Sequence, residues 1–238
     1  MGARLMLKVF IGYDKNETVA RHVLAHSIER RCSIPVSITA LRLEQLPMTR
    51  ERNPLQSTDF AFSRFLVPWL CDYEGIGVFL DCDMLCRTDI AQIMDEISPW
   101  VAVSVVKHNY APRPEDKFLG QPQTIYAKKN WSSVMVFNNT RCQSLTPEYV
   151  NRASGLELHQ FKWLDNDAEI GSLDPSWNHL VGEYKRNAQA KIVHYTLGTP
   201  CFKKYSECEY AQEWRDELTD MLSYNKIGEF NRQDREAA

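Results

Sequence analysis

The stretch Val78-Phe79-Leu80-Asp81-Cys82-Asp83 joins a short apolar run to two acids that are separated by one residue. An apolar run that follows chain-breaking Gly75 and Gly77 is typical of a buried strand in a parallel sheet. Side chains at positions i and i+2 of a strand point to the same side, so the two carboxylates are expected to face one way. Open α/β sheets bind their ligands at the carboxyl ends of the strands. The stretch therefore predicts a paired-carboxylate site at that edge of an α/β sheet.

The segments that precede this stretch predict alternating strands and helices. Apolar residues dominate 7–11 and 36–41, which are bounded by the turn residues Gly12 and Pro35 and are expected to be strands. Between them, apolar side chains recur at helical spacing over 19–28, with Asn16 as the expected N-cap. Strands that are separated by helices form right-handed β-α-β units. The fold class predicted is α/β, with a mainly parallel sheet flanked by helices.

Further elements are expected from local pattern. A helix over 59–70, capped by Asp59 and kinked by Pro68, is expected before the third strand. Beyond Asp83, the expected elements are a helix over 89–97, strands over 101–106, 134–137 and 192–195, and an amphipathic helix over 209–222. A Pro-rich loop, with Pro112, Pro114 and Pro122, separates the first two of these strands.

The domain organisation is expected to be a single unit over 1–238, because no linker or repeat interrupts the chain. Within it we expect a nucleotide-binding half at about 6–106, an acceptor and sugar half at about 107–205, and a C-terminal helix and tail at 206–238.

Composition excludes several classes of function. The net charge of −3 over 238 residues gives no polyanion-binding surface, so nucleic acid is not expected as a partner. No run approaches the roughly 20 apolar residues that a membrane-spanning helix needs. The seven cysteines are odd in number and form no C-x-x-C pair, which argues against a disulfide framework and a zinc site. A cytoplasmic protein in a reducing compartment is therefore expected.

Three residues are candidate metal ligands. Asp81 and Asp83 offer hard oxygen ligands, which suit Mg²⁺ or Mn²⁺ bridging a diphosphate. His194 ends the apolar run Lys191-Ile192-Val193-His194, and an imidazole beside two carboxylates favours Mn²⁺. The alternatives are two solvated turn carboxylates and a structural histidine. A second D-x-D, Asp165-Asn166-Asp167, shows that the motif also arises by chance.

Seven segments, in this order, resemble the GT-A-type glycosyltransferases and in particular glycosyltransferase family 8, the retaining galactosyl- and glucosyltransferases that include glycogenin. They are Val9-Phe10-Ile11-Gly12-Tyr13-Asp14, Phe60-Ala61-Phe62-Ser63-Arg64-Phe65, Phe79-Leu80-Asp81-Cys82-Asp83, Ser133-Val134-Met135-Val136-Phe137-Asn138, Trp163-Leu164-Asp165-Asn166-Asp167, Trp177-Asn178 and His194-Tyr195. The resemblance implies a GT-A-type, Rossmann-like mixed sheet. It also implies a metal-dependent transfer of a hexose from a nucleotide-diphosphate sugar, by default a UDP-sugar, to an acceptor hydroxyl with retention.

The resemblance also implies roles for single residues. Metal ligation falls to Asp81, Asp83 and His194, with Mn²⁺ or Mg²⁺ as the cofactor. The residues implied in donor binding are Ile11, Tyr13, Asp14, Arg64, Asp81 and Cys82. Asp165 and Asn166 are implied at the donor sugar as catalytic residues. From the residues alone, Asp14 is also a common turn former, Arg64 can pair with an acid such as Asp59, and Cys82 faces away from the carboxylates into the core.

Two positions depart from the family pattern. Gly198 stands four residues after His194 where the family has a glycine after three, and no lysine follows in Thr199-Pro200-Cys201-Phe202. Lys203 or Lys204 is the nearest substitute for the lysine that neutralises the departing diphosphate. Asn166 replaces the more usual glutamine, which changes the group beside the sugar.

Three other functions fit parts of the sequence. A non-catalytic nucleotide-sugar-binding module would keep the scaffold without the missing lysine. A haloacid dehalogenase-type phosphatase also opens with an apolar run and D-x-D, but position 85 is Leu where that motif has Thr or Val. A nucleotidyltransferase would need a basic phosphate-binding loop near the first strand, where only Lys15 stands.

Overall fold

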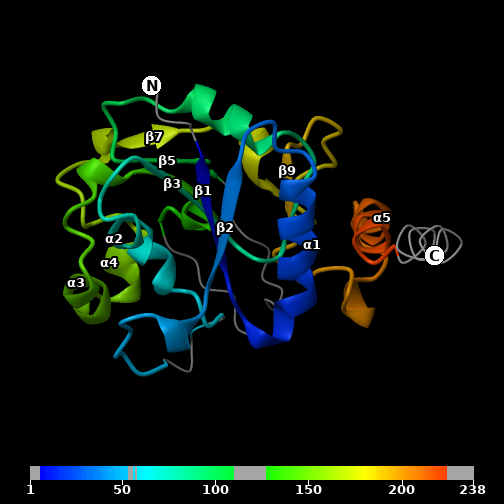
Figure 1. Ribbon diagram of the computed structural model, residues 1–238, viewed down its shortest axis with the longest axis horizontal. Coiled ribbons are helices and arrows are strands. Elements are labelled where there is room, and N and C mark those ends of the chain that lie inside the picture. Colours follow the sequence, from blue (N-terminus) through cyan, green and yellow to red (C-terminus); the bar gives the residue numbers. More distant parts are fainter. Residues whose placement is uncertain (1–5, 53–55, 57, 110–126, 224–238) are drawn as a thin grey trace, which may run out of the picture.

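The computed structural model describes residues 6–52, 56, 58–109 and 127–223. A six-stranded sheet forms its centre, in the order β2-β1-β3-β6-β5-β7 (Figure 1). The strands are β1 (Leu7–Gly12), β2 (Val36–Leu41), β3 (Ile76–Leu80), β5 (Val103–Val105), β6 (Val134–Asn138) and β7 (Ile170–Ser172). β1 runs parallel to β2 and β3, and β5 runs parallel to β7, while β6 is antiparallel to both of its neighbours. The α/β class and the mixed, mainly parallel sheet are confirmed.

A second sheet of three strands continues from the end of β3. It consists of β4 (Met84–Cys86), β9 (Ile192–His194) and β8 (His179–Leu180), with β9 in the middle. β4 pairs with β9 in the antiparallel direction, and β8 pairs with β9 in the parallel direction. This small sheet joins segments more than a hundred residues apart in the sequence.

Helices flank the large sheet. In Figure 1, α1 (Thr18–Glu29) and α5 (Ala211–Met221) lie on one flank, and the short helices α2 (Val67–Leu70), α3 (Pro147–Arg152) and α4 (Gly155–His159) gather on the other. The 3₁₀ helices are η1 (Lys15–Glu17), η2 (Leu43–Gln45), η3 (Ser63–Leu66), η4 (Ile90–Glu96), η6 (Trp131–Ser133), η7 (Asn139–Arg141), η8 (Asp167–Glu169), η9 (Pro175–Asn178) and η10 (Lys203–Tyr205). Within the described ranges, no helix is long and apolar enough to cross a membrane.

Three details of the expected helices are wrong. Asp14, not Asn16, begins the first helical segment, because its side chain accepts the Asn16 backbone N–H at 2.9 Å and a 3₁₀ turn precedes α1. The expected helix from Asp59 is instead a turn followed by η3 and α2. Pro68 stands in the first turn of α2, where its missing N–H breaks no helical hydrogen bond, so it begins this helix and does not kink it.

The expected helix over 89–97 forms as the 3₁₀ helix η4, with Asp89 as its cap. Most of the Pro-rich loop, at 110–126, and the tail at 224–238 lie outside the described residues.

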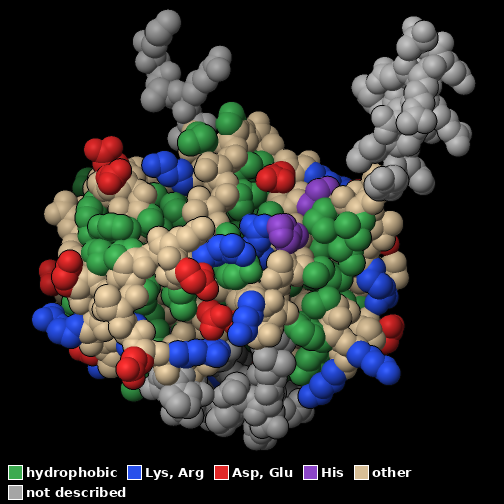
Figure 2. Space-filling model, turned by 60° about the horizontal axis from the view of Figure 1, so that its bottom comes forward, with side chains coloured by type: hydrophobic (Ala, Val, Ile, Leu, Met, Phe, Trp, Pro, Cys, Tyr) green, Lys and Arg blue, Asp and Glu red, His purple; other side chains and the backbone are tan. Residues whose placement is uncertain are grey.

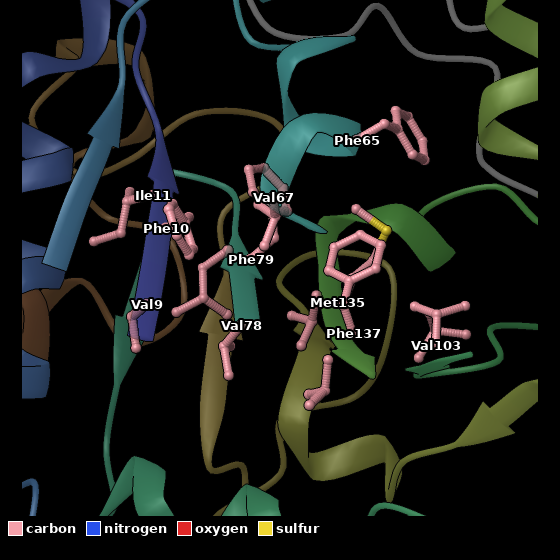
Figure 3. Packing of buried hydrophobic residues seen from close by; sticks show 14 of the residues in the cluster. Val9, Phe10, Ile11, Phe65, Val67, Val78, Phe79, Val103, Met135 and Phe137 are labelled. Carbon is pink, nitrogen blue, oxygen red and sulfur yellow. The ribbon is translucent and has the colours of Figure 1, made fainter. Parts of the chain in front are cut away.

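The main core fills the space between the large sheet and its flanking segments. Buried side chains of β1, β3 and β6 meet those of the α2 region, including Phe65, Phe79 and Phe137 (Figure 3). At the carboxyl end of β1, a Cβ on Gly12 would lie 2.4–2.6 Å from the Phe60 ring. Only glycine lets the Phe60 ring pack this closely against the strand.

Helix α5 docks onto α1 through a buried acid. Glu217, whose side chain is 2% exposed, accepts a hydrogen bond from His26 Nδ1 at 2.6 Å and pairs with Arg31 Nη2 at 2.7 Å. Trp214, also on α5 and 1% exposed, belongs to the same buried apolar cluster as Val23 of α1. Burial by itself would raise the pKa of Glu217, but Arg31 and His26 outweigh it and hold the pKa below the ordinary value. The carboxylate is thus ionised and satisfied.

Glu217→Gln is expected to lower the free energy of unfolding by about 1.5–3 kcal/mol at pH 7, the range for hydrogen bonds to charged groups. Because the folded-state pKa is lowered, the stabilisation is present above the ordinary glutamate pKa of about 4.3 and is lost as the pH falls through the folded pKa. Urea unfolding at pH 7 and in steps below pH 4.3 measures the difference between the two proteins. A difference that grew on acidification would contradict this assignment.

Candidate functional site

The two acids of the D-x-D lie at the carboxyl end of β3, as predicted. The Asp81 backbone N–H donates to Ser133 O at 3.0 Å, which adds one more ladder bond beyond β3, and the chain then bends into β4. Both carboxylates face the His194 ring. Their common side follows from this bend between two strands and not from alternation along one strand, because β3 ends at Leu80.

The pairing of β4 with β9 brings His194 to these acids. His194 lies opposite Met84 in the ladder, and the next residue, Tyr195, donates its N–H to Asp83 O at 2.9 Å. Nε2 of His194 lies 3.2 Å from Asp83 Oδ1 and 3.8 Å from Asp81 Oδ2. One ligand atom from each of the three residues lies within 4.8 Å of the others. The metal-site hypothesis required these three side chains to lie close together, and they do. We call Asp81, Asp83 and His194 the triad.

The orientation of the His194 ring is set by Asn178. The Asn178 amide nitrogen Nδ2 donates to Ser133 Oγ at 2.9 Å, and Ser133 Oγ donates to Asn130 O at 2.6 Å. The amide oxygen Oδ1 therefore faces His194 and accepts from Nδ1–H at 3.0 Å. With the proton on Nδ1, a neutral His194 directs the Nε2 lone pair at Asp81 and Asp83, as a metal-ligating histidine does.

The electrostatics of the triad also suit a cation. Burial alone would lower the pKa of His194, but Asp83 and Asp81 outweigh it and raise the pKa above the ordinary value. The side chains of Asp81 and Asp83 are 15% and 14% exposed, so their charges are little screened by solvent. Two carboxylates and an inward-facing imidazole nitrogen match the ligand types of Mn²⁺ and fit a divalent ion.

Arg64 holds the first of these acids. Its buried guanidinium lies over the rings of Phe60 and Phe79, with Nη1 2.8 Å from Asp81 Oδ1 and 2.8 Å from Ser132 O. The acid beside Arg64 is therefore Asp81; Asp59 lies 3.4 Å from Arg52 instead. Because Oδ1 is engaged by Arg64, Asp81 presents Oδ2 toward His194.

Cys82 faces away from the carboxylates into the core, as expected from its place between them. Its buried thiol donates to Glu17 Oε2 at 3.4 Å. Burial, followed by the charge of Asp83, raises the pKa of Glu17 well above its usual range. No pattern in the sequence singled out Glu17, because an acid at the start of a helix is typically solvated.

Three candidates for donor binding, Ile11, Tyr13 and Asp14, lie at the end of β1, and they differ in which of their groups are available to a ligand. Ile11 is buried in the core, so only its backbone is available to a ligand. The Tyr13 hydroxyl accepts a hydrogen bond from Arg42 at 2.8 Å, and the Arg42 guanidinium covers the Tyr13 ring at 4.2 Å. Asp14 is buried and uses both carboxylate oxygens on backbone N–H groups, those of residues 16 and 59. The turn that these bonds fix leads from β1 into η1.

The second D-x-D lines a hollow that no residue of the triad lines. Asp165 and Asn166 are exposed, line a hollow of about 410 Å³ together with Lys128, and make no hydrogen bond or ion pair with a triad residue within the described chain. The Asn166 side chain accepts the Ala168 N–H at 2.9 Å and so caps η8. Lys203 and Lys204, the substitutes considered for the missing family lysine, are also exposed.

Charges of both signs mix on the face that Figure 2 shows. Histidine, basic and acidic side chains gather near its centre, and hydrophobic side chains lie beside them. This face presents no continuous basic or acidic field.

The chain resembles known proteins in sequence and in structure. No family model matches the sequence. The chain is 43% identical over 230 residues to Protein CDI of Arabidopsis thaliana. The aligned region covers 92% of this chain and 87% of that protein.

Several solved structures that resemble the chain are glycosyltransferases. The bifunctional glycosyltransferase WbbM superposes on 96% of this chain with a TM-score of 0.64 and 14% sequence identity. GlyE of Streptococcus pneumoniae TIGR4 superposes on 92% of this chain with a TM-score of 0.59 and 13% sequence identity. The chain spans 52% of the WbbM chain and 62% of the GlyE chain. The galactosyltransferase LgtC, solved with donor and acceptor sugar analogs, gives 0.53 and 10% over 91% of this chain and 96% of its own.

These similarities identify the fold by structure and the family by sequence. The chain has the fold of GT-A-type glycosyltransferases and belongs to the family of Arabidopsis thaliana Protein CDI.

Proposed function

We propose that the chain is a metal-dependent glycosyltransferase of family 8 type, which moves a hexose from a UDP-sugar to an acceptor hydroxyl with retention of configuration. The observation that carries the proposal is the triad at the carboxyl edge of a sheet with the GT-A fold. That edge is where open α/β sheets bind nucleotides.

Asp81, Asp83 and His194 would hold Mn²⁺, or Mg²⁺ in its place. A cation held there would supply Lewis-acid stabilisation of the negative charge on the diphosphate. Asn178 keeps the His194 proton on Nδ1, and Arg64 keeps the Asp81 carboxylate turned toward the site. The chain's own residues thus fix the ligand geometry before the donor arrives, which removes the cost of reorganising charged groups.

Donor contacts are assigned to the segments around the triad. The Ile11 backbone and the side chains of Tyr13 and Asp14 lie at the end of β1, beside the end of β3 in the parallel ladder, and are proposed to hold the base and ribose. Arg64 is proposed to act at the diphosphate position through Asp81. Cys82 is proposed to contribute only its backbone there, because its thiol faces Glu17. Asp165 and Asn166, exposed at their hollow, are proposed to bind the donor sugar as the catalytic pair.

The site is proposed to lie in a single domain over 1–238, with a nucleotide-binding half at about 6–106 and an acceptor and sugar half at about 107–205. All seven cysteines are free, which supports a reducing, cytoplasmic compartment.

Melting temperatures with UDP and with GDP, each with and without Mn²⁺, test the proposal. A ligand at 100 times its dissociation constant adds about 2.7 kcal/mol to stability, which raises the melting temperature of a chain of this size by several degrees. We expect a rise with UDP that requires Mn²⁺ and exceeds the rise with GDP. Release of UDP from UDP-glucose or UDP-galactose then separates an enzyme from a binding module. No rise with either nucleotide would contradict the proposal.

A further inference from the structure

A buried acid that is not one of the triad lies behind the D-x-D turn. Glu17 is the last residue of η1, directly before α1, and is 2% exposed. Its Oε2 accepts the hydrogen bond from the Cys82 thiol, the residue between the two acidic ligands. Its Oε1 is shielded from solvent and has no hydrogen-bond partner among the described residues.

The surroundings of Glu17 are acidic. The charged side chains that act on its carboxyl are Asp83, Asp14 and Asp81, all of the same sign. In the described ranges, no lysine, arginine or histidine forms an ion pair with it. A buried carboxyl with one unsatisfied oxygen and only acids around it is costly, because it has lost its water and gained no opposite charge.

Glu217 shows how this chain treats a buried acid with a purely structural role. Glu217 is equally buried, but His26, Arg30 and Arg31 surround its carboxylate and satisfy it. Glu17 receives only a thiol, which is a weak donor. A neutral amide oxygen is also able to accept from the Cys82 thiol, so this contact does not by itself require an acid at position 17.

A cation bound at the triad would place a positive charge near Glu17, which forms no ion pair with a basic side chain among the described residues. The triad ligands and Glu17 lie on the two sides of the same turn, with Cys82 between Asp81 and Asp83. Charges separated by a poorly hydrated protein interior interact more strongly than charges across water. A divalent ion would offset the repulsion among the four acids.

We propose that Glu17 is a positioning residue of the cation site, which stabilises the divalent ion at the triad through its charge and holds the D-x-D turn through Cys82. The inference rests on the proposed metal site and extends it by one residue outside the ligand set. A role at the cation site explains why an acid stands at position 17, which the contact with Cys82 alone does not explain.

Direct Mn²⁺ binding, followed by the electron paramagnetic resonance signal of the free ion, tests the proposal on the whole chain. Glu17→Gln keeps the shape and the acceptor for Cys82 but removes the charge. We expect it to weaken Mn²⁺ binding at least about tenfold, which corresponds to about 1.4 kcal/mol. Glu29→Gln is the matched control: it makes the same change on an exposed residue at the far end of α1 and is expected to bind Mn²⁺ as the wild type does.

Melting temperature without metal is the second measurement. Glu17→Gln is expected to melt no lower than the wild type when metal-free, and to gain less on addition of Mn²⁺. Equal Mn²⁺ affinity in Glu17→Gln and wild type would overturn the inference, and so would a loss of stability that is the same with and without Mn²⁺. If the wild type binds Mn²⁺ and Asp83→Ala does not, the metal site of the proposed function stands whatever Glu17→Gln does. If the wild type binds no Mn²⁺, both fail.

Discussion

Replacing Asp83 with alanine is expected to abolish Mn²⁺ binding and lower donor turnover by at least about 1,000-fold, while the chain stays folded. Asp83 Oδ1 lies 3.2 Å from His194 Nε2, and both point into the proposed cation site. A metal that polarises a phosphoryl oxygen lowers the activation barrier by several kcal/mol, and about 1.4 kcal/mol is a factor of ten in rate. Release of UDP from UDP-glucose and UDP-galactose in Mn²⁺ measures this loss.

The fold is expected to survive because the backbone of Asp83, and not its side chain, binds the neighbouring strand. The Tyr195 N–H donates to Asp83 O, and the β4–β9 ladder continues from Met84. Removing the side chain also relieves repulsion between two neighbouring carboxylates. Asp167→Ala, in the exposed second D-x-D, is the matched control and is expected to keep its Mn²⁺ affinity. Turnover by Asp83→Ala near that of the wild type would refute the metal centre.

Replacing Asn178 with alanine is expected to weaken Mn²⁺ binding about 10- to 100-fold, the usual cost of losing the partner that orients a metal-ligating histidine. Asn178 is fully buried and fixes the Nδ1 proton of His194. Without it, the ring is free to rotate or to carry its proton on Nε2, where the proton blocks the metal. Titration with Mn²⁺ measures the affinity.

Asn178→Asp separates orientation from packing. A carboxylate at this position still accepts the Nδ1 proton, and the Ser133 hydroxyl is able to turn and donate to it. This variant is expected to retain most of the Mn²⁺ affinity that Asn178→Ala loses. If the two variants lost affinity equally, the role of Asn178 in setting the His194 tautomer would be wrong.

The sequence determined much of the central fold, because these elements depend on local pattern. Apolar runs bounded by Gly12 and Pro35 predicted β1 and β2 to within one residue, and a 3.6-residue period predicted α1 and α5. The same reasoning placed Asp81 at the end of a buried parallel strand, since a run of apolar residues and the acid that ends it are neighbours in the chain.

Only the tertiary structure decided what surrounds that acid. His194 reaches Asp83 through a ladder between β4 and β9, whose partners lie 110 residues apart at Met84 and His194, and short strands of three residues carry no periodic signal of their pairing. The ion pair between Arg64 and Asp81 and the burial of Glu17 likewise follow from packing between elements. Local pattern tells whether a side chain is apolar or charged. Which charges share a buried site is fixed by burial and by strand register, and these exist only once the chain has folded.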